Sequence, residues 1–411
     1  MQIKVSSPAT IHTEIKLPSS KSISNRVLII NALGKGEFMP QNLSDCDDTR
    51  VMIEALSSAN ETIDIMAAGT AMRFLTAFLS VTNNHKTLTG TQRMQQRPIQ
   101  LLVNALRELG ATIEYVGNEG FPPLKFAGKS LQGGEIRLEG NISSQYISAL
   151  LMIAPILKEG LTLHLTGEII SKPYINLTLQ LMHDFGADAQ WIGGNTIKVS
   201  SKPYNSIPFT VESDWSAASY WYEIVALSPN AEVELSGLFP NSYQGDSEVA
   251  GLFAQLGVNT SFTDKGVLLT KNGKLTDKME YDFISQPDLA QTFVVTCALL
   301  GVPFHFTGLQ SLKIKETDRM AALINELSKL GYVLSEENNS VLSWDGTRKE
   351  AQAQPTIDTY EDHRMAMAFA PACLRIPSIR INEPQVVSKS YPGYWKDLEK
   401  AGFLMVHPTN A

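Results

Sequence analysis

The chain has 411 residues, of which 43% are hydrophobic and 18% are charged, and its formal net charge is −8. This length predicts about two domains, and the composition is that of an ordinary soluble globular protein. The acidic balance argues against nucleic acid or an anionic membrane as a partner. The first residues lack an apolar signal core, and no long apolar run occurs, so we expect a cytoplasmic protein.

Cysteine and histidine usage argues against several classes of site. The three cysteines, Cys46, Cys297 and Cys373, are far apart, which disfavours a disulfide framework or a zinc site. The seven histidines show no metal-ligand spacing. No dinucleotide-binding glycine motif or phosphate-binding P-loop occurs. We therefore expect no metal and no nucleotide cofactor.

One repeating unit occurs six times along the chain. In its full form it consists of a strand, an apolar helix, a second strand with a glycine turn, a second helix and a hairpin. The first strands end at equivalent positions, mostly about 73 residues apart: Leu17, Ile65, Leu138, Val211, Phe283 and Ile357. The second helices are expected to stop at a glycine in the left-handed conformation: Gly110, Gly186, Gly257 or Gly331. The first unit lacks its closing hairpin, near residues 59–61.

Each full unit has the order β-α-β-α-β-β, which predicts an α/β fold of two similar domains with three units each. The division is expected between the third and fourth units, near residues 212–214. A solenoid kept only for stability is the alternative. It is disfavoured because equivalent loops carry different charged side chains.

Basic side chains in the first half stand where helices are expected to begin. Lys21, Ser22 and Arg26 fall on the first turns of one helix, where serines cap and the N-terminus attracts anions. Gly69 precedes a second helix and can offer backbone N–H groups. Arg97 stands just before another helix, whose first position suits the following proline.

Hydroxyl and amide groups mark two further helix starts in this half. Ser143, Ser144 and Gln145 begin one helix, and Ser171 with Tyr174 stands in the matching half of the unit. Helix capping alone would explain each serine taken singly.

The second half carries both signs of charge. Lys315 and Arg319 are spaced i, i+4, which predicts one helical face, with a solvated salt bridge as the ordinary alternative. Asp288 and Glu316 are acidic residues among the cations, and a carboxylate so placed can act as general base or acid. The remaining cations are Arg364, at the start of a buried helix, and Lys389 in the last loop.

Seven cations thus stand on corresponding loops of a net acidic chain. Guanidinium forks suit phosphate and carboxylate oxygens, and lysines act as mobile point charges. One or two small polyanionic ligands held between the two domains best explain the set, which is Lys21, Arg26, Arg97, Lys315, Arg319, Arg364 and Lys389.

These segments resemble, in the same order and over nearly the whole chain, the signature segments of the 5-enolpyruvylshikimate-3-phosphate synthase family. The matching segments are 21–26, 68–73, 97–99, 143–145, 171–174, 315–319 and 362–367. The resemblance implies the inside-out barrel of the enolpyruvyl transferases, with the first unit shortened. It also implies an N-terminal domain of residues 19–212, a C-terminal domain of residues 1–18 and 213–411, and an active site in the cleft between them.

The implied activity is transfer of the enolpyruvyl group of phosphoenolpyruvate to the 5-hydroxyl of shikimate-3-phosphate, releasing phosphate through a tetrahedral intermediate. This reaction belongs to the shikimate pathway of aromatic amino acid biosynthesis. The resemblance implies a monomer without cofactor or metal, in which Lys21, Asp288 and Glu316 are catalytic.

The resemblance also assigns the two substrates to particular residues. Shikimate-3-phosphate would be bound by Lys21, Ser22, Arg26, Ser143, Ser144, Gln145, Ser171, Tyr174, Asp288, Ser311 and Lys315. Phosphoenolpyruvate would be bound by Lys21, Gly69, Arg97, Gln145, Arg319, Arg364 and Lys389.

Three positions depart from the family pattern. Ala67 and Ser311 stand where the family usually has asparagine, and Phe74 replaces the proline that commonly follows the Met-Arg pair. The missing hairpin of the first unit lies just upstream. Our hypothesis is an altered affinity for phosphoenolpyruvate and for glyphosate-like mimics.

Two alternatives stay open at this point. UDP-N-acetylglucosamine enolpyruvyl transferase shares the architecture but usually carries a cysteine before the Arg-Pro pair, where residues 89–96 have none. A non-catalytic relative that only binds anions would be expected to lose Asp288 or Glu316, and both are present.

Overall fold

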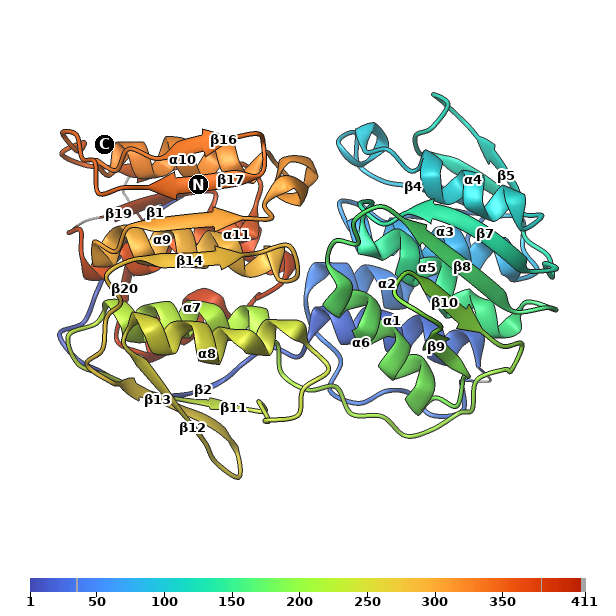
Figure 1. Ribbon diagram of the computed structural model, residues 1–411, viewed down its shortest axis with the longest axis horizontal. Coiled ribbons are helices and arrows are strands. Elements are labelled where there is room, and N and C mark those ends of the chain that lie inside the picture. Colours follow the sequence, from blue (N-terminus) through green and yellow to red (C-terminus); the bar gives the residue numbers. More distant parts are fainter. Residues whose placement is uncertain (35, 378, 408–411) are drawn as a thin grey trace. The chain divides into compact units, whose positions relative to one another are not determined.

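The computed structural model describes residues 1–34, 36–377 and 379–407, and the chain divides into two compact units (Figure 1). Unit 1 comprises Met1–Pro18 and Ser213–Ala411, and unit 2 comprises Ser19–Glu212. In the described ranges, every helix falls short of the length and apolarity needed to cross a membrane.

Both units are built from four-stranded sheets that share one pairing pattern. In each sheet the first two strands run parallel, and two antiparallel strands complete it. The sheets of unit 2 are, in strand order, β3 (Thr62–Asp64), β4 (Thr87–Thr89), β6 (Leu124–Ala127) and β5 (Thr112–Tyr115), and β7 (Gly134–Glu139), β8 (Leu161–Thr166), β10 (Thr196–Val199) and β9 (Ala189–Trp191).

Unit 1 has three sheets of the same kind. The first contains, in order, β2 (Ile11–Lys16), β11 (Ala231–Ser236), β13 (Gly266–Lys271) and β12 (Val258–Phe262). The second contains β14 (Met279–Asp282), β15 (Phe304–Thr307), β17 (Val341–Trp344) and β16 (Ser335–Glu337). The third contains β18 (Thr356–Ile357), β19 (Ile379–Asn382), β1 (Gln2–Ser6) and β20 (Leu404–Val406).

The N-terminal segment completes two sheets of unit 1. Strand β2 pairs in parallel with β11, and β1 lies between β19 and β20. The prediction that a strand ending at Val211 opens the fourth unit is therefore wrong, because β2 occupies that place. Thr210, next to Val211, forms an isolated parallel bridge with Gln41 inside unit 2. Equivalent strands of a repeat look alike in sequence, so their exchange leaves no local signal.

The first helix of each repeat is buried in the centre of its unit. In unit 2 the central helices α1 (Lys21–Leu33), α3 (Gly69–Val81) and α5 (Ser144–Ile153) pack on one another. In unit 1 the equivalent helices are α7 (Trp215–Leu227), α9 (Ala290–Leu300) and α11 (His363–Phe369). Figure 1 shows these helices among the sheets of their own unit. Helices enclosed in this way are expected to be apolar on most sides, as these are.

The second helix of each repeat lies farther from the centre of its unit than the first helix. The second helices are α2 (Asp47–Ser57), α4 (Gln100–Glu108), α6 (Lys172–Asp184), α8 (Val249–Phe253), α10 (Arg319–Lys329) and α12 (Tyr394–Lys400). The four glycines expected to end such helices all have positive φ, which confirms the prediction. The α/β fold of repeated units is likewise confirmed.

Two local predictions about helix starts are wrong. Asp318 caps α10 by accepting the Ala321 N–H at 3.0 Å, so the helix begins at Arg319. Lys315 therefore lies in the preceding loop and does not share a helical face with Arg319. Helix α4 begins at Gln100, which leaves Pro98 before the helix instead of in its first turn.

Candidate active site

The predicted site residues fall into two groups, one in each unit. The unit 2 cluster contains Lys21, Ser22, Arg26, Gly69, Arg97, Ser143, Ser144, Gln145, Ser171 and Tyr174. The unit 1 cluster contains Asp288, Lys315, Glu316, Arg319, Arg364 and Lys389.

Lys21 is the first residue of α1 and lies next to a buried carboxylate. Ser20 caps this helix by accepting the Ile23 N–H at 3.3 Å, which confirms a predicted capping role. Lys21 Nζ is 3.6 Å from Asp48 Oδ2. Sequence reasoning missed Asp48, because an acidic residue in the first turn of α2 is also the ordinary complement to the helix dipole.

Gly69 opens α3 and leaves room for two guanidinium groups. A Cβ at this position would lie 2.6 Å from Arg73 Nη1 and 2.7 Å from Arg97 Nη1. Arg73 also donates to the Gly69 carbonyl at 2.8 Å. Two guanidinium groups beside helical N–H groups make an anion site. Arg73 was not among the predicted site residues, although it stands in the matching segment.

The polar residues at the start of α5 connect that helix to α3. Ser143 is the N-cap and accepts the Gln145 N–H at 3.3 Å, and Ser144 is the first helical residue. The Gln145 side chain donates to Thr70 Oγ1 at 3.2 Å. The amide therefore stands beside the first turn of α3, close to Gly69.

Arg26 is buried at the meeting point of the central helices of unit 2. Its Nε donates to Thr178 Oγ1 at 2.7 Å, and its Nη1 donates to the Ser22 carbonyl at 2.9 Å. Its Nη2 donates to Ser148 Oγ at 3.2 Å. Burial lowers the pKa of Arg26 to about 10. Among the described residues, Arg26 forms no ion pair with a carboxylate.

Ser171 and Tyr174 begin α6, next to the Arg26 network. Ser171 has a φ of 53°, and its side chain does not cap the helix. Such a conformation costs free energy in a residue other than glycine and is common at functional sites. The Tyr174 carbonyl accepts from Thr178 Oγ1 at 2.9 Å, which connects this turn to Arg26.

Asp288 lies between three cations of unit 1. Its Oδ1 is 3.3 Å from Arg319 Nη1 and 3.7 Å from Lys315 Nζ. Its Oδ2 accepts from Arg364 Nη2 at 3.0 Å. Burial lowers the pKa of Lys315, and the charge of Asp288 opposes that shift.

Glu316 is held by two of the predicted cations. Its Oε2 accepts from Arg319 Nη2 at 2.8 Å, and its Oε1 is 2.8 Å from Lys389 Nζ. The loop position of Glu316, just before α10, makes both contacts possible. The Arg319 guanidinium thus contacts both Glu316 and Asp288. These are the two carboxylates that are predicted to transfer protons to and from the substrates.

Arg319 makes its shortest bond to a carboxylate that sequence reasoning had not selected. Its Nε donates to Asp362 Oδ2 at 2.6 Å. Asp362 also caps α11 by accepting the Arg364 N–H at 2.9 Å. Burial alone would lower the pKa of Arg319, but Asp362, Glu316 and Asp288 together raise it. The guanidinium therefore stays charged.

Other buried groups border the unit 1 cluster. Arg364 Nη1 donates to Tyr220 Oη at 3.2 Å, and burial raises the pKa of that phenol to about 12. Asp246 accepts from the Ser216 hydroxyl, and burial followed by the charge of Asp288 raises its pKa to about 7. Ser311 forms no side-chain hydrogen bond within the described ranges, so the structure does not bring it into the cluster.

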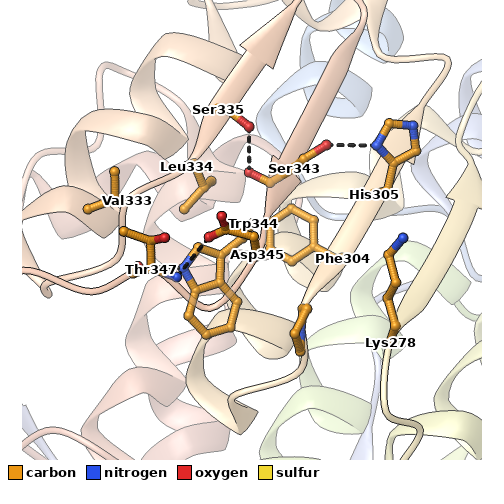
Figure 2. Close-up of a pocket in the computed structure, with 11 residues that line it drawn as sticks. Lys278, Phe304, His305, Val333, Leu334, Ser335, Ser343, Trp344, Asp345 and Thr347 are labelled. Carbon is orange, nitrogen blue, oxygen red and sulfur yellow. Dashed lines mark hydrogen bonds between the residues drawn. The ribbon is translucent and has the colours of Figure 1, made fainter.

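A separate cavity of about 500 Å³ lies along β15 and β17 (Figure 2). Its lining includes His305, whose Nδ1 is 2.8 Å from Ser343 Oγ, together with Trp344 and Lys278. It contains none of the predicted site residues and no converging set of cations. We therefore place the candidate site in the two clusters and not in this cavity. In the described part of the chain, no group of histidine, cysteine and acidic residues is arranged to hold a metal ion.

Comparison with known proteins identifies the family. The model of the EPSP synthase (3-phosphoshikimate 1-carboxyvinyltransferase) family matches residues 5–60 and 56–398. A 3-phosphoshikimate 1-carboxyvinyltransferase from Bacteroides fragilis is 68% identical over 403 residues, covering 98% of each chain. A protein of the same name from Shewanella pealeana is 35% identical and covers 96% of this chain and 98% of its own length.

Solved structures agree in fold. EPSP synthase from Acinetobacter baumannii superposes with a TM-score of 0.79 at 20% identity, covering 99% of this chain and 100% of its own. The enolpyruvyl transferase NikO from Streptomyces tendae gives a TM-score of 0.74 at 14% identity, covering 100% of this chain and 99% of its own. At these identities the structures support the fold alone. The sequence matches go further: this chain belongs to the EPSP synthase (3-phosphoshikimate 1-carboxyvinyltransferase) family.

Proposed function

We propose that the chain transfers the enolpyruvyl group of phosphoenolpyruvate to the 5-hydroxyl of shikimate-3-phosphate and releases phosphate. Membership of the family and the 68% identity over nearly the whole length support this activity. The structural observation that carries it is the contact of Arg319 with both Asp288 and Glu316. Two carboxylates held among cations suit a reaction that moves protons beside bound anions.

The first half of the reaction is an addition. Asp288 takes the proton of the 5-hydroxyl as that oxygen attacks C2 of phosphoenolpyruvate. Glu316, in its protonated form, delivers a proton to the methylene carbon, with Lys21 assisting. A tetrahedral ketal phosphate results. The surrounding lysines and arginines stabilise the charge of the phosphate and carboxylate groups.

The second half is an elimination that restores the double bond. Glu316 takes a proton back from the methyl carbon, the bond from C2 to the phosphate oxygen breaks, and inorganic phosphate leaves. The proton that Asp288 accepted is released to solvent or to the phosphate. The proposed steps use side chains and the two substrates.

We further propose that both clusters, one within residues 19–212 and one within residues 1–18 and 213–411, act on the same pair of substrates. The cations of the unit 2 cluster would hold phosphate and carboxylate groups of both ligands. The unit 1 cluster would add Lys315 for shikimate-3-phosphate, further cations for phosphoenolpyruvate, and the proton-transfer groups Asp288 and Glu316. We expect the enzyme to act as a cytoplasmic monomer.

Phosphate release tests the activity directly. The protein is mixed with phosphoenolpyruvate and either shikimate-3-phosphate or UDP-N-acetylglucosamine, and released phosphate is measured. We expect turnover with shikimate-3-phosphate alone. Turnover with the nucleotide sugar alone would instead assign the reaction of the related transferase, and no release with either acceptor would contradict the proposal.

Three residues depart from the family pattern: Ala67, Phe74 and Ser311. We expect them to alter the affinity for phosphoenolpyruvate. Ala67 lies exposed in the turn just before α3, where an asparagine side chain could reach an anion. We expect Ala67→Asn to lower the Michaelis constant for phosphoenolpyruvate by a few-fold, about the value of one hydrogen bond. A normal constant and normal glyphosate inhibition in the unmodified protein would contradict the hypothesis.

A further inference from the structure

One buried cation in unit 2 has an unusual environment. Arg26 is 3% exposed, and its three hydrogen-bond partners are all neutral: the Thr178 and Ser148 hydroxyls and the Ser22 carbonyl. Removing a charge from water without a counter-charge is costly, so a second source of stabilisation is expected.

The Phe74 ring supplies a negative surface at this place. The Arg26 guanidinium lies over the ring, with Cζ 5.3 Å from the ring centroid. Phe74 is fully buried in α3. The face of an aromatic ring carries partial negative charge, and its attraction for a cation grows when both groups are removed from water.

The ring and the hydroxyls fix the guanidinium from different sides. Ser22 belongs to α1, Ser148 to α5, Thr178 to α6 and Phe74 to α3, so four helices of unit 2 meet at this one cation. Ser148 Oγ and Thr178 Oγ1 lie 2.8 Å apart and hold each other in place. The guanidinium therefore has little freedom to turn before a ligand arrives.

We propose that Phe74 is a positioning residue, whose ring face holds the Arg26 guanidinium charged and oriented for the anionic groups of shikimate-3-phosphate. This inference rests on the proposed function for the identity of the ligand. The family usually has proline at this position, and proline has no aromatic face. We therefore expect this contact with Arg26 only in sequences with an aromatic residue here.

Phe74 also belongs to the helix that begins at Gly69, where phosphoenolpyruvate is expected. A substitution that merely disturbs α3 would therefore change the Michaelis constants of both substrates. A change confined to the electronics of the ring would alter shikimate-3-phosphate binding alone. This difference separates positioning of Arg26 from a general packing role.

The test replaces Phe74 with mono-, di- and trifluorophenylalanine by unnatural amino acid incorporation. Fluorine withdraws charge from the ring face with little change in size. We expect the dissociation constant for shikimate-3-phosphate to rise stepwise, by about tenfold across the series. Across the series the dissociation constant for shikimate-3-phosphate should change several times more than the Michaelis constant for phosphoenolpyruvate.

The matched control is the same series at Phe78, one turn later on α3, whose ring makes no cation contact within the described residues. It should leave the dissociation constant unchanged. A flat series at Phe74, or equal slopes at both positions, would overturn the proposal.

Thermal unfolding without ligand separates this inference from the proposed function. If the unmodified protein binds no shikimate-3-phosphate, the proposed function fails. In that case a stepwise fall in unfolding temperature at Phe74 but not at Phe78 still supports the ring's hold on Arg26. Equal unfolding temperatures across the Phe74 series would overturn that part as well.

Discussion

Arg26 and Arg319 are the same side chain buried in two different ways. They are 3% and 1% exposed, and each lies in the cluster of its own unit. Hydroxyls, a carbonyl and an aromatic ring surround Arg26, whereas Asp288, Glu316 and Asp362 surround Arg319. The pKa of Arg26 is lowered to about 10, and that of Arg319 is raised.

The different surroundings of the two arginines indicate that the two clusters have different roles. A cation held by neutral groups keeps its charge available for a ligand anion. A cation held by carboxylates instead keeps those carboxylates in position. We therefore expect the surroundings of Arg26 to determine binding and those of Arg319 to determine proton transfer and the stability of unit 1.

Removing the carboxylate that is proposed as the base gives the largest expected effect. Asp288→Asn keeps the shape of the side chain but cannot accept the hydroxyl proton. We expect turnover to fall by about 100-fold to 10,000-fold. Steady-state phosphate release measures it, with Asp264→Asn, an exposed acid on the β12–β13 turn, as the control. Turnover within a few-fold of the unmodified protein would exclude Asp288 as the base.

Replacing each arginine with methionine tests the comparison through stability. Arg319→Met leaves Asp362 buried without its partner, which should lower the free energy of unfolding by about 3–5 kcal/mol. Arg26→Met leaves two hydroxyls that can bond to each other and a carbonyl that belongs to helix α1, so the change should stay within about 1 kcal/mol. Urea unfolding of both variants gives these values. Equal losses would show that the two environments do not differ as described.

A third buried ionisable group, Glu223 in α7, should make stability depend on pH. Burial raises the pKa of this carboxyl well above its ordinary value, and the Thr296 hydroxyl opposes the shift in part. The folded state keeps the proton while the unfolded state loses it above about pH 4.3, so stability falls as pH rises. Each unit by which the folded pKa exceeds the unfolded one lowers stability at high pH by about 1.4 kcal/mol.

Glu223→Gln removes this titration. We expect the variant to be more stable than the unmodified protein at pH 8, with the advantage shrinking toward pH 4. Unfolding temperatures across this range provide the measurement. An advantage independent of pH would mean that Glu223 does not retain its proton on folding.

A smaller effect on binding is expected in the space above Gly69. Gly69→Ala places a methyl group where the Arg73 and Arg97 guanidinium groups now lie, and both must shift. We expect the Michaelis constant for phosphoenolpyruvate to rise by about tenfold, the equivalent of one weakened charged hydrogen bond. Gly251→Ala, at an exposed position of α8 with open space around it, is the control. An unchanged constant would place phosphoenolpyruvate elsewhere.

Local signals account for what the sequence predicted well. The serines that cap α1 and α5 and the glycines after the second helices act within a few residues, so their roles can be predicted from neighbours alone. The motif residues likewise stand at helix starts. Asp318 shows the limit, because a capping side chain one residue before Arg319 moved the helix start and separated Lys315 from it.

Long-range features had no such signal. The exchange of β2 for the strand expected at Val211 depends on pairing between segments that lie far apart along the chain. Asp48 and Asp362 have ordinary local explanations as helix-start acids, and only the folded chain shows their contacts with Lys21 and Arg319. The position of Phe74 beneath Arg26 is of the same kind.

Calorimetry tests the different roles of Arg26 and Asp288 most directly. Shikimate-3-phosphate is titrated into the unmodified protein, into Arg26→Met and into Asp288→Asn. We predict that Arg26→Met weakens binding by about 100-fold, whereas Asp288→Asn keeps it within about tenfold despite its loss of turnover. Unchanged binding by Arg26→Met, or loss of binding by Asp288→Asn alone, would contradict the assignment of shikimate-3-phosphate binding to Arg26 and of proton transfer to Asp288.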